Sequence, residues 1–389
     1  MRADREGGWL AAFYFLYFCA LGAFMPYWGP WLHAQGQGPL AIGILTAATQ
    51  FSKVLAPNLW GWLAHFWGGR RIVPWAALIT AASFFALYLA HGHFPMLLLV
   101  TLAFSFFWAA TLPLVDATTM DWAQYRGAAY GRIRLWGSLG FIALSLGMGW
   151  LIAHWGMTAF LPGILGFLMA TWWASRHLPY GGGGSPRLHA ERPRLSDALH
   201  ERHLWFFLLA GVLEQASHGA YYAFYSIYAE QHGLDSVTVG MLWGFAVLCE
   251  VAFFWVGDRF IRHWGVPWVL GGAFLLTALR WGVIAWWPGL VWIILVQTLH
   301  AASYAAFHLA AVHWVSARFP PALRARGMAL YASTVYGLGG GIGALGAGWS
   351  WARWGGSGTF TAAAFLALSG VFFLIWALRP RSALEKKVS

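Results

Sequence analysis

The chain consists of long apolar segments separated by short polar stretches. About 20 apolar residues span the hydrocarbon core of a bilayer as a helix, and a helix satisfies its backbone hydrogen bonds internally. The sequence therefore predicts an all-α membrane protein with twelve transmembrane helices. The twelve segments are 9–33, 40–67, 72–91, 95–120, 130–153, 157–177, 203–230, 236–262, 267–287, 289–317, 327–352 and 358–378.

Basic residues gather at one end of these segments. All but three of the 24 Lys and Arg residues fall on one side, in both termini and in the connections from even to odd segments. The exceptions are Arg353 on the other side and Lys53 and Arg280 inside segments. Because cytoplasmic loops carry the excess of basic residues, we expect both termini in the cytoplasm and a multi-pass protein of the bacterial inner membrane.

Short motifs recur about 200 residues apart, which indicates an internal repeat. Val73-Pro74-Trp75 recurs as Val266-Pro267-Trp268, and Arg126-Gly127 recurs as Arg326-Gly327. The longest polar stretch lies between the two copies and reads as a flexible cytoplasmic linker, with binding of lipid headgroups by its basic residues as the alternative. The expected units are an N-terminal six-helix half (1–178), the linker (179–202) and a C-terminal six-helix half (203–389).

The composition agrees with a membrane protein and excludes several other classes. Hydrophobic residues make up 60% of the chain and charged residues 10%, and the mean hydropathy is +0.59. The net charge of +11 does not indicate a nucleic-acid partner, because the basic residues lie at the membrane surface. Cys19 and Cys249 both lie inside apolar segments, so we expect no disulfide framework.

Two charged residues stand at the centre of apolar segments. Lys53 lies roughly 20 Å along the helix from Leu40, at about 1.5 Å per residue, which is close to the bilayer midplane. Ile42-Gly43-Ile44-Leu45 recurs as Val239-Gly240-Met241-Leu242, and the same spacing leads from Lys53 to Glu250. Such a charge costs about 2.5–3.5 kcal/mol on insertion scales. We therefore expect the functional centre at these two residues.

The other ionisable residues inside segments are few. We expect Asp116 to form a gate, and Arg280 to be a partner of Glu250 or Glu214. Several histidines also lie inside segments, but they lack the i, i+4 spacing of a helical metal pair, so we expect no metal site and no cofactor. These histidines are His218, His300, His308 and His313.

Two further patterns concern small and aromatic residues. Gly341-Ile342-Gly343-Ala344-Leu345-Gly346 spells a dinucleotide-binding fingerprint, but it lies inside a predicted span with no strand before it. Its glycines are better explained by the close approach of two helices than by dinucleotide binding. Aromatic residues on the first and seventh segments are expected to stack on a ring-bearing substrate. They are Tyr27, Trp28, Tyr221, Tyr222 and Tyr225.

Two stretches resemble one branch of a known transporter family. The stretch from Lys53 to His65, followed by Gly68-Gly69-Arg70-Arg71, resembles the second helix and the following loop of the phenylpropionate permease-like branch of the major facilitator superfamily. The stretch from Tyr130 to Gly140 resembles the fifth helix of that branch. The resemblance covers essentially the whole chain. It implies two pseudo-symmetric six-helix bundles with a substrate site between them. This chain departs from the usual pattern at one position: it has His65 where the loop motif of that branch usually has an acidic residue.

A more distant similarity is to the lactose permeases. Asp116 and Arg134 match a substrate-binding acid and arginine on the fourth and fifth helices, and Arg280, Glu250 and His300 match polar residues of the later helices. The resemblance thereby implies substrate contacts for Asp116, Arg134 and Arg280. Gln297 stands where those permeases have a lysine, and Ser303 where they have the acid that releases the proton. Any proton must therefore be carried elsewhere, with Glu250 or Glu214 as candidates.

Together these features predict a secondary active transporter, not an enzyme, that imports an aromatic carboxylate with protons by alternating access. Lys53 would bind the anion, and Glu250 would carry the proton with help from Glu214 and His300. The substrate contacts are expected at Lys53, Asp116, Arg134, Tyr27, Tyr221 and Arg280. The expected partners are the small-molecule substrate, protons and the lipid bilayer, and we expect a monomer.

Two alternatives remain at this stage. A proton-coupled sugar or nucleoside permease would use Lys53 only to pair with Glu250. An intramembrane enzyme or a receptor is the alternative from another class. The two-fold repeat and the lack of a metal or nucleophile constellation argue against it.

Overall fold

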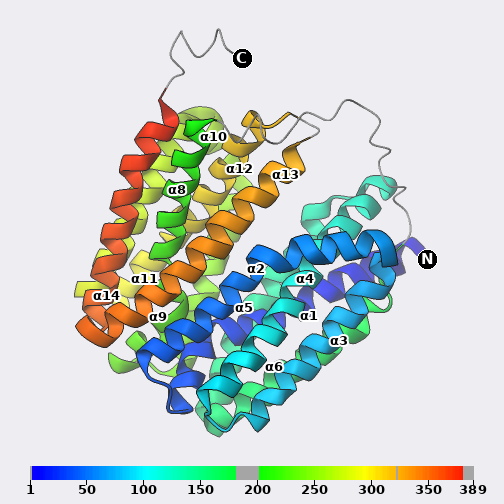
Figure 1. The fold of residues 1–389 in the computed structure, drawn as a ribbon, viewed down its shortest axis with the longest axis horizontal. Helices are drawn as coiled ribbons and strands as arrows, with labels where there is room; N and C mark the ends of the chain where they lie inside the picture. The colour runs from blue at the N-terminus through cyan, green and yellow to red at the C-terminus, as the bar shows by residue number, and fades with distance from the viewer. Residues whose placement is uncertain (1, 181–200, 321–322, 380–389) are drawn as a thin grey trace.

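The computed structural model describes residues 2–180, 201–320 and 323–379, and these ranges contain helices and no strand (Figure 1). The all-helical prediction is therefore confirmed for the described part. The expected linker 179–202 lies mostly outside it. The elements are α1 (Arg2–Ala34), α2 (Pro39–Trp67), α3 (Gly69–Phe85), η1 (Ala86–Leu89), α4 (Phe94–Arg126), α5 (Tyr130–Trp155), η2 (Gly156–Ala159), α6 (Phe160–Ser175), α8 (Arg202–Ser217), α9 (Gly219–Gln231), α10 (Ser236–Trp286), α11 (Leu290–Gln297), η3 (Ala301–Ala306), α12 (Phe307–Arg318), α13 (Arg324–Tyr331), η4 (Ala332–Gly339) and α14 (Gly340–Leu378).

Eight continuous helices in the described ranges are long and apolar enough to cross a membrane, which makes the chain a multi-pass membrane protein. Three of them are much longer than the roughly 20 residues that one crossing needs. Each contains a glycine with positive φ at which the helix axis bends: Gly156 (65°), Gly265 (79°) and Gly355 (67°). These bends coincide with breaks between segments expected from the sequence.

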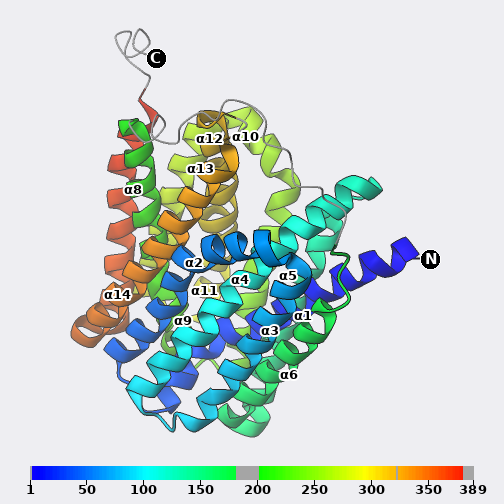
Figure 2. The same ribbon diagram turned by 45° about the vertical axis from the view of Figure 1, so that its right-hand side comes forward.

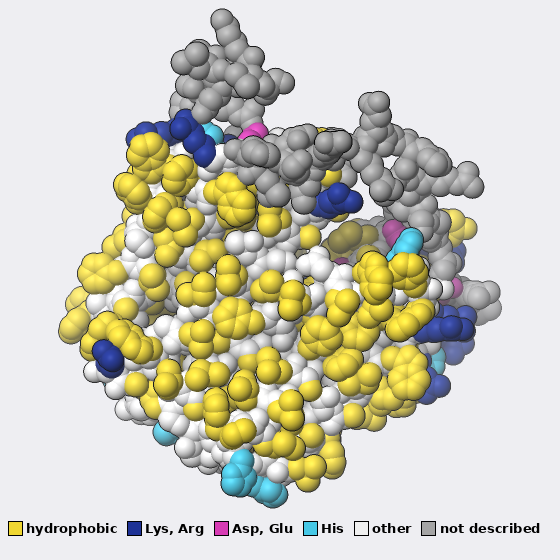
Figure 3. Space-filling model, in the orientation of Figure 1, with side chains coloured by type: hydrophobic (Ala, Val, Ile, Leu, Met, Phe, Trp, Pro, Cys, Tyr) yellow, Lys and Arg dark blue, Asp and Glu magenta, His cyan; other side chains and the backbone are white. Residues whose placement is uncertain are grey.

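The helices form two groups that meet along a limited set of contacts. Helices α1–α6 lie in one group and α8–α14 in the other, as Figures 1 and 2 both show. The groups touch through α2 with α14, α5 with α10, and α1 with α9. On the opposite side they diverge, and the surface is hollowed between them at the upper right of Figure 3.

Glycine allows one of these contacts to be unusually close. A Cβ built on Gly43 of α2 would lie 2.7 Å from the carbonyl oxygen of Ala344 and 2.8 Å from the Cα of Gly348, both on α14. Within the C-terminal group, Gly343 packs against the backbone of Ala216 in the same way. Gly346 has no atom within 4 Å of such a Cβ. The close approach expected for this glycine-rich stretch is therefore confirmed at Gly343 but not at Gly346.

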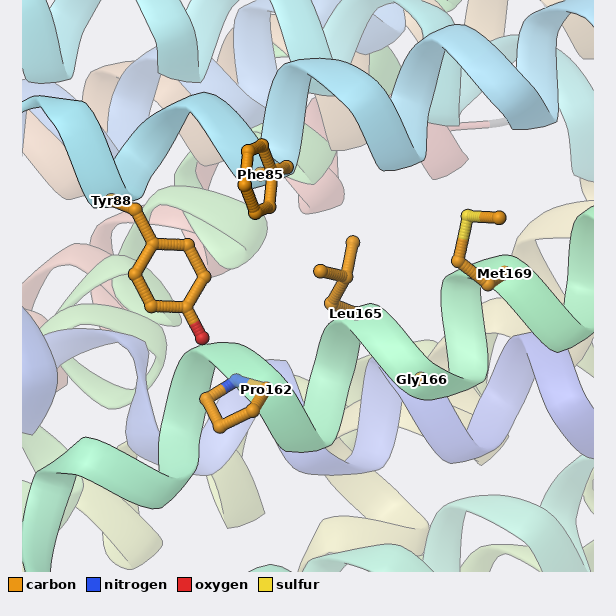
Figure 4. A pocket seen from close by; sticks show the side chains of 6 residues that line it. All are labelled: Phe85, Tyr88, Pro162, Leu165, Gly166 and Met169. Atoms are coloured by element: carbon orange, nitrogen blue, oxygen red, sulfur yellow. The ribbon is translucent and has the colours of Figure 1, made fainter.

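The outer surface is apolar, as Figure 3 shows for one face. A groove of about 590 Å³ lies on this surface between α6 and the end of α3 with η1, where Phe85 and Tyr88 face Leu165 and Met169 (Figure 4). Its walls carry almost no polar group, so it belongs to the lipid-facing surface. A polar side chain caps the start of the helix α10. Asp235 accepts a hydrogen bond of 2.7 Å from the Thr238 amide at the start of α10, and its hydrogen bonds with Thr238 lower the pKa of Asp235.

Candidate functional site

A pocket lies within the N-terminal group and is closed on one side by α9. It encloses about 100 Å³ and combines one cation with aromatic walls and short polar side chains. Helices α1, α2 and α4 supply all of its lining except Tyr222. The lining residues are Tyr17, Leu21, Phe24, Met25, Trp28, Thr46, Thr49, Gln50, Lys53, Phe104, Ser105, Trp108, Ala109 and Tyr222.

Lys53 supplies the positive charge of this pocket. Its Nζ donates a hydrogen bond of 2.6 Å to Gln50 Oε1, which occupies one of the three ammonium protons. In the described part of the chain, no Asp or Glu forms an ion pair with Lys53, and its side chain is exposed to the cavity. The pairing of Lys53 with Glu250, which the sugar or nucleoside alternative required, is absent in this structure.

The aromatic walls are held by contacts among themselves. Phe24 stacks on Trp28 with ring centroids 4.8 Å apart, and Trp108 meets Phe24 edge-on at 5.3 Å. Phe104 contacts Phe24 edge-on at 5.7 Å. Such offset and edge-on arrangements are the favoured geometries for aromatic pairs. The walls are therefore pre-formed around a space next to Lys53.

A second polar cluster lies inside the C-terminal group and centres on Arg280, whose side chain is fully buried. Its Nη1 lies 2.8 Å from His300 Nδ1 and 3.1 Å from Ser303 Oγ, and its Nη2 donates to Gln297 Oε1 at 2.6 Å. The guanidinium also lies over the ring of Tyr221, 4.5 Å from its centroid. Arg280 is thus held by neutral groups on α11, on the turn that follows it, and on α9.

His300 connects Arg280 to Glu250. A guanidinium has N–H donors and no acceptor, so His300 Nδ1 must accept from Arg280. The imidazole proton then resides on Nε2, which lies 2.5 Å from Glu250 Oε1. A neutral histidine therefore donates to the Glu250 carboxyl group, which is partly exposed. Arg280 is therefore linked to Glu250, one of the two acids expected as its partner, only through this ring.

The backbone around His300 departs from regular α-helix. Residues Ala301–Ala306 form a π-helical turn directly after it, and a second one spans Ala332–Gly339. Such turns are rare and are frequently found at functional sites. The widened turn carries Ser303, which accepts from Arg280 in the cluster.

Glu214 lies apart from this chain of contacts. Its side chain is fully buried, and Oε1 accepts a hydrogen bond of 2.6 Å from Thr277, whereas Oε2 has no partner. His218 bonds the Glu214 backbone carbonyl at 3.0 Å. In the described ranges, no three His, Cys, Asp or Glu residues are grouped as metal ligands would be.

Asp116 and Arg134, expected as a gate and as substrate contacts, each have aromatic side chains of the N-terminal group as neighbours. Asp116 accepts hydrogen bonds from Tyr14 at 2.6 Å and Tyr130 at 2.9 Å, while the Arg134 guanidinium lies over Phe18, 4.1 Å from the ring centroid. Two tyrosine hydroxyls thus satisfy the acid, and the cation packs on an aromatic face.

Tyr27, expected as a substrate contact, is not among the residues that line the pocket in this structure. Its ring is fully buried, and its hydroxyl donates toward the carbonyls of Ser145 at 3.0 Å and Ser236 at 2.8 Å. These carbonyls belong to α5 and to the start of α10. Tyr27 therefore ties the two helical groups together. Its neighbour Trp28 lines the pocket, whereas Tyr221 lies in the Arg280 cluster.

Several pocket residues were not predicted, although the sequence contains a signal for them. Thr46, Gln50 and Lys53 have the i, i+4, i+7 spacing of one helix face, and Ser105 and Trp108 share a face of α4. Polar side chains at such spacings inside an apolar span mark a face turned away from lipid. A search for charged residues alone does not detect the neutral residues Thr46, Gln50 and Ser105.

Comparisons with known proteins agree with this architecture. The MFS_1 like family matches residues 8–362. A "Probable 3-phenylpropionic acid transporter" of Escherichia coli (strain K12) is 30% identical over 326 residues, which is 80% of this chain and 82% of that protein. A "Maltose permease" of Geobacillus stearothermophilus is 28% identical and covers 96% and 95%.

Solved structures show the same fold. A crystal structure of the nucleoside transporter NupG superposes with a TM-score of 0.82 at 17% identity, and covers 97% of this chain and 100% of that one. From the family match and the 30% identical relative, the chain belongs to the MFS_1 like family and is a transporter of the major facilitator superfamily.

Proposed function

We propose that this transporter imports a small aromatic carboxylate together with protons, by alternating access. The observation that carries the substrate class is Lys53. It is a cation without an acidic partner among the described residues, and it lies in a pocket with pre-formed aromatic walls. Two of its protons are unoccupied, so a carboxylate can accept charge-assisted hydrogen bonds from them. The relative described as a probable 3-phenylpropionic acid transporter supports the same class.

Proton coupling is assigned to Glu250. Desolvation favours the neutral form of a carboxyl group and a nearby cation favours the charged form. When the two halves move, both the desolvation of the Glu250 carboxyl group and its distance from nearby cations change. His300 donates to Glu250 Oε1, so a proton can occupy the other oxygen without breaking this contact. Glu214 is the alternative carrier, because one of its buried oxygens has no partner.

The proposed topology has twelve crossings. In this count α8 with α9, α11 with α12, and α13 with the first part of α14 form one crossing each, while α10 and α14 are each divided at their glycine bends. The cavity next to Lys53 then opens toward the cytoplasm, where both termini lie, and the contacts through Tyr27 and Gly43 close the outer side. The chain works as a monomer in the bacterial inner membrane, because the path lies between its own two halves. This arrangement is the one in which major facilitator transporters bind substrate near the midplane.

The test is uptake by purified protein in liposomes with a pH gradient, acidic outside. We expect 3-phenylpropionate to accumulate above its external concentration, and an uncoupler that dissipates the gradient to prevent this. Uptake that stops when the internal concentration of the carboxylate equals the external one would contradict proton coupling. Absence of any carboxylate uptake would contradict the substrate class.

A sugar or nucleoside is the second candidate, supported by the 28% identical maltose permease and by the fact that sugars also stack on aromatic rings. The same liposomes, supplied in parallel assays with radiolabelled maltose and uridine, distinguish the two classes. Uphill uptake of either neutral solute, with none of the carboxylate, would favour this alternative. The uncompensated charge of Lys53 would then have no role in binding.

A further inference from the structure

On the side where the two groups of helices touch, two hydroxyls form hydrogen bonds from one group to the other. Tyr27 Oη on α1 lies 3.0 Å from the carbonyl oxygen of Ser145 on α5 and 2.8 Å from that of Ser236 at the start of α10. Ser236 Oγ in turn donates to the Gly149 carbonyl on α5 at 2.9 Å. Each group thus supplies one hydroxyl to a carbonyl of the other. We call these contacts the hydroxyl bridge.

Glycines of both groups leave room for the tyrosine hydroxyl. A Cβ built on Gly149 would lie 2.5 Å from Tyr27 Oη, and a Cβ built on Gly240 of α10 would lie equally close to the same oxygen. The side chain of Tyr27 is fully buried, so it has no free space into which it could retreat. The hydroxyl therefore lies between two helix backbones, at a place where any side chain larger than glycine would displace it.

Opening of this side would break the two hydrogen bonds that join the groups. Tyr27 would separate from Ser236, and Ser236 would separate from Gly149, while the single phenolic proton of Tyr27 could remain with Ser145 in its own group. Water entering the opened side would replace the lost partners, so the net contribution of each hydrogen bond is modest. A modest contribution is enough to decide which state prevails when two conformations are close in free energy.

We propose that the hydroxyl bridge sets the resting conformation of the transporter. Without substrate, it keeps this side closed and the hollow between the groups open on the other side (Figure 3). The inference rests on the alternating access of the proposed function. It adds the residues that set the balance between the two access states, and Tyr27 and Ser236 do so without lining the pocket beside Lys53.

The test is the measurement of distances between pairs of spin labels by pulsed electron paramagnetic resonance, in lipid nanodiscs without substrate. Both native cysteines are replaced by alanine. One pair of labels, at Ala34 and Gln231, lies at the exposed ends of α1 and α9 and reports on the closed side. The other pair, at Trp67 and Trp264, lies at the end of α2 and just before the bend of α10 and reports on the open side.

Removal of either hydroxyl should move both distances, in opposite directions. We expect Tyr27→Phe and Ser236→Ala each to raise the ratio of the opposite access state to the resting state about three- to tenfold, and the double variant to raise it further. In that state the 34–231 distance is longer and the 67–264 distance is shorter. The matched controls are Tyr88→Phe in the outer groove and Ser369→Ala, whose hydroxyl donates within its own helix. Both controls should leave the distances unchanged.

Substitutions that add atoms should act in the same direction as those that remove hydroxyls. In Gly149→Ala and Gly240→Ala the new methyl group would displace the Tyr27 hydroxyl, so the resting state should again lose population. Gly147→Ala is the control on α5, because no atom lies closer than 3.7 Å to its added Cβ. A general loss of stability would broaden both distance distributions and would not shorten the 67–264 distance.

Unchanged distances in Tyr27→Phe, Ser236→Ala and their double variant would overturn the proposal. A longer 34–231 distance without a shorter 67–264 distance would also overturn it, because the closed side would then loosen without a change of access state. Either result would leave the carboxylate as the substrate class. Conversely, failure of carboxylate uptake in liposomes would leave the role of the bridge intact, because the labels report on both sides without substrate.

Discussion

His300 Nε2 lies 2.5 Å from Glu250 Oε1, and Arg280 on the other side of the ring determines that the histidine is the donor in this contact. The carboxyl group therefore receives a hydrogen bond whether or not it carries a proton itself. The three residues come from two parts of α10 and from the turn after α11. A shift between these elements would change the surroundings of Glu250, as alternating access requires.

Glu250→Gln should separate transport from proton coupling. The amide oxygen of glutamine still accepts from His300, so the cluster should persist, but the side chain can no longer take up a proton. We expect substrate exchange across liposome membranes to continue and accumulation driven by a pH gradient to disappear. Glu214→Gln serves as the comparison. Normal uphill transport by Glu250→Gln would remove it as the carrier, and uncoupling by Glu214→Gln alone would move that role to Glu214.

Arg280→Lys should destabilise the C-terminal group although the charge is kept. A single ammonium cannot reach His300, Ser303 and Gln297 with the same geometry as the guanidinium fork. Each lost hydrogen bond to a charged group costs about 1.5–3 kcal/mol. We expect a clearly lower melting temperature in detergent. Arg353→Lys is the control, because Arg353 packs on Trp349 at the surface. Equal melting temperatures of the two variants would contradict the claim that the buried contacts of Arg280 stabilise the C-terminal group.

Gly43→Leu should impair the closed contact between α2 and α14. There is no space for a side chain where its Cβ would approach Ala344 and Gly348, and overpacking typically costs about 1–3 kcal/mol. Because this contact joins the two groups, transport should fall more than thermal stability does. Gly346→Leu provides the matched substitution on α14, where space is open. Similar uptake rates in the two variants would show that this contact does not open and close during transport.

Separate expression of residues 1–185 and 186–389 tests whether the segment between the groups is only a linker. Each fragment contains one group of helices, and packing through α1, α2 and α5 should reassemble them in the membrane. We expect uptake to return when both fragments are produced together and to be absent with either one. Loss of uptake despite both fragments being in the membrane would give the connecting segment a part in the transport cycle.

The fold could be predicted largely from local pattern, because an apolar run in a bilayer has few options besides a helix. Even the bends at Gly265 and Gly355 fall where the apolar segments were expected to be interrupted. The count of eight by length and hydropathy is below twelve for two reasons. The helices at 130–175, 236–286 and 324–378 each continue through a bend, and α8 and α9 are not among the eight. Helix continuity across a short turn depends on backbone geometry that residue type alone does not determine.

The site was predictable only in part, because side-chain partners depend on how distant helices rotate against each other. The central charges Lys53 and Glu250 were singled out by their depth, and His300 was expected to assist Glu250. The hydrogen bond of Lys53 with Gln50 and the position of His300 between Glu250 and Arg280 were not predicted. The hydrogen bonds that Tyr14 and Tyr130 donate to Asp116 were also not predicted. A tyrosine hydroxyl can satisfy a half-buried acid without a second charge, and nothing in the spacing of the charged residues indicates this.

The most direct test of Lys53 as the anion site compares 3-phenylpropionate with its neutral amide, which has the same size and ring. Titration of the wild-type protein should show the acid binding at least tenfold more tightly than the amide, since a hydrogen bond to a charged group is worth about 1.5–3 kcal/mol. In Lys53→Ala the acid should lose this advantage while the amide changes little, and Lys53→Arg should restore part of it. An undiminished preference for the acid in Lys53→Ala would contradict the account.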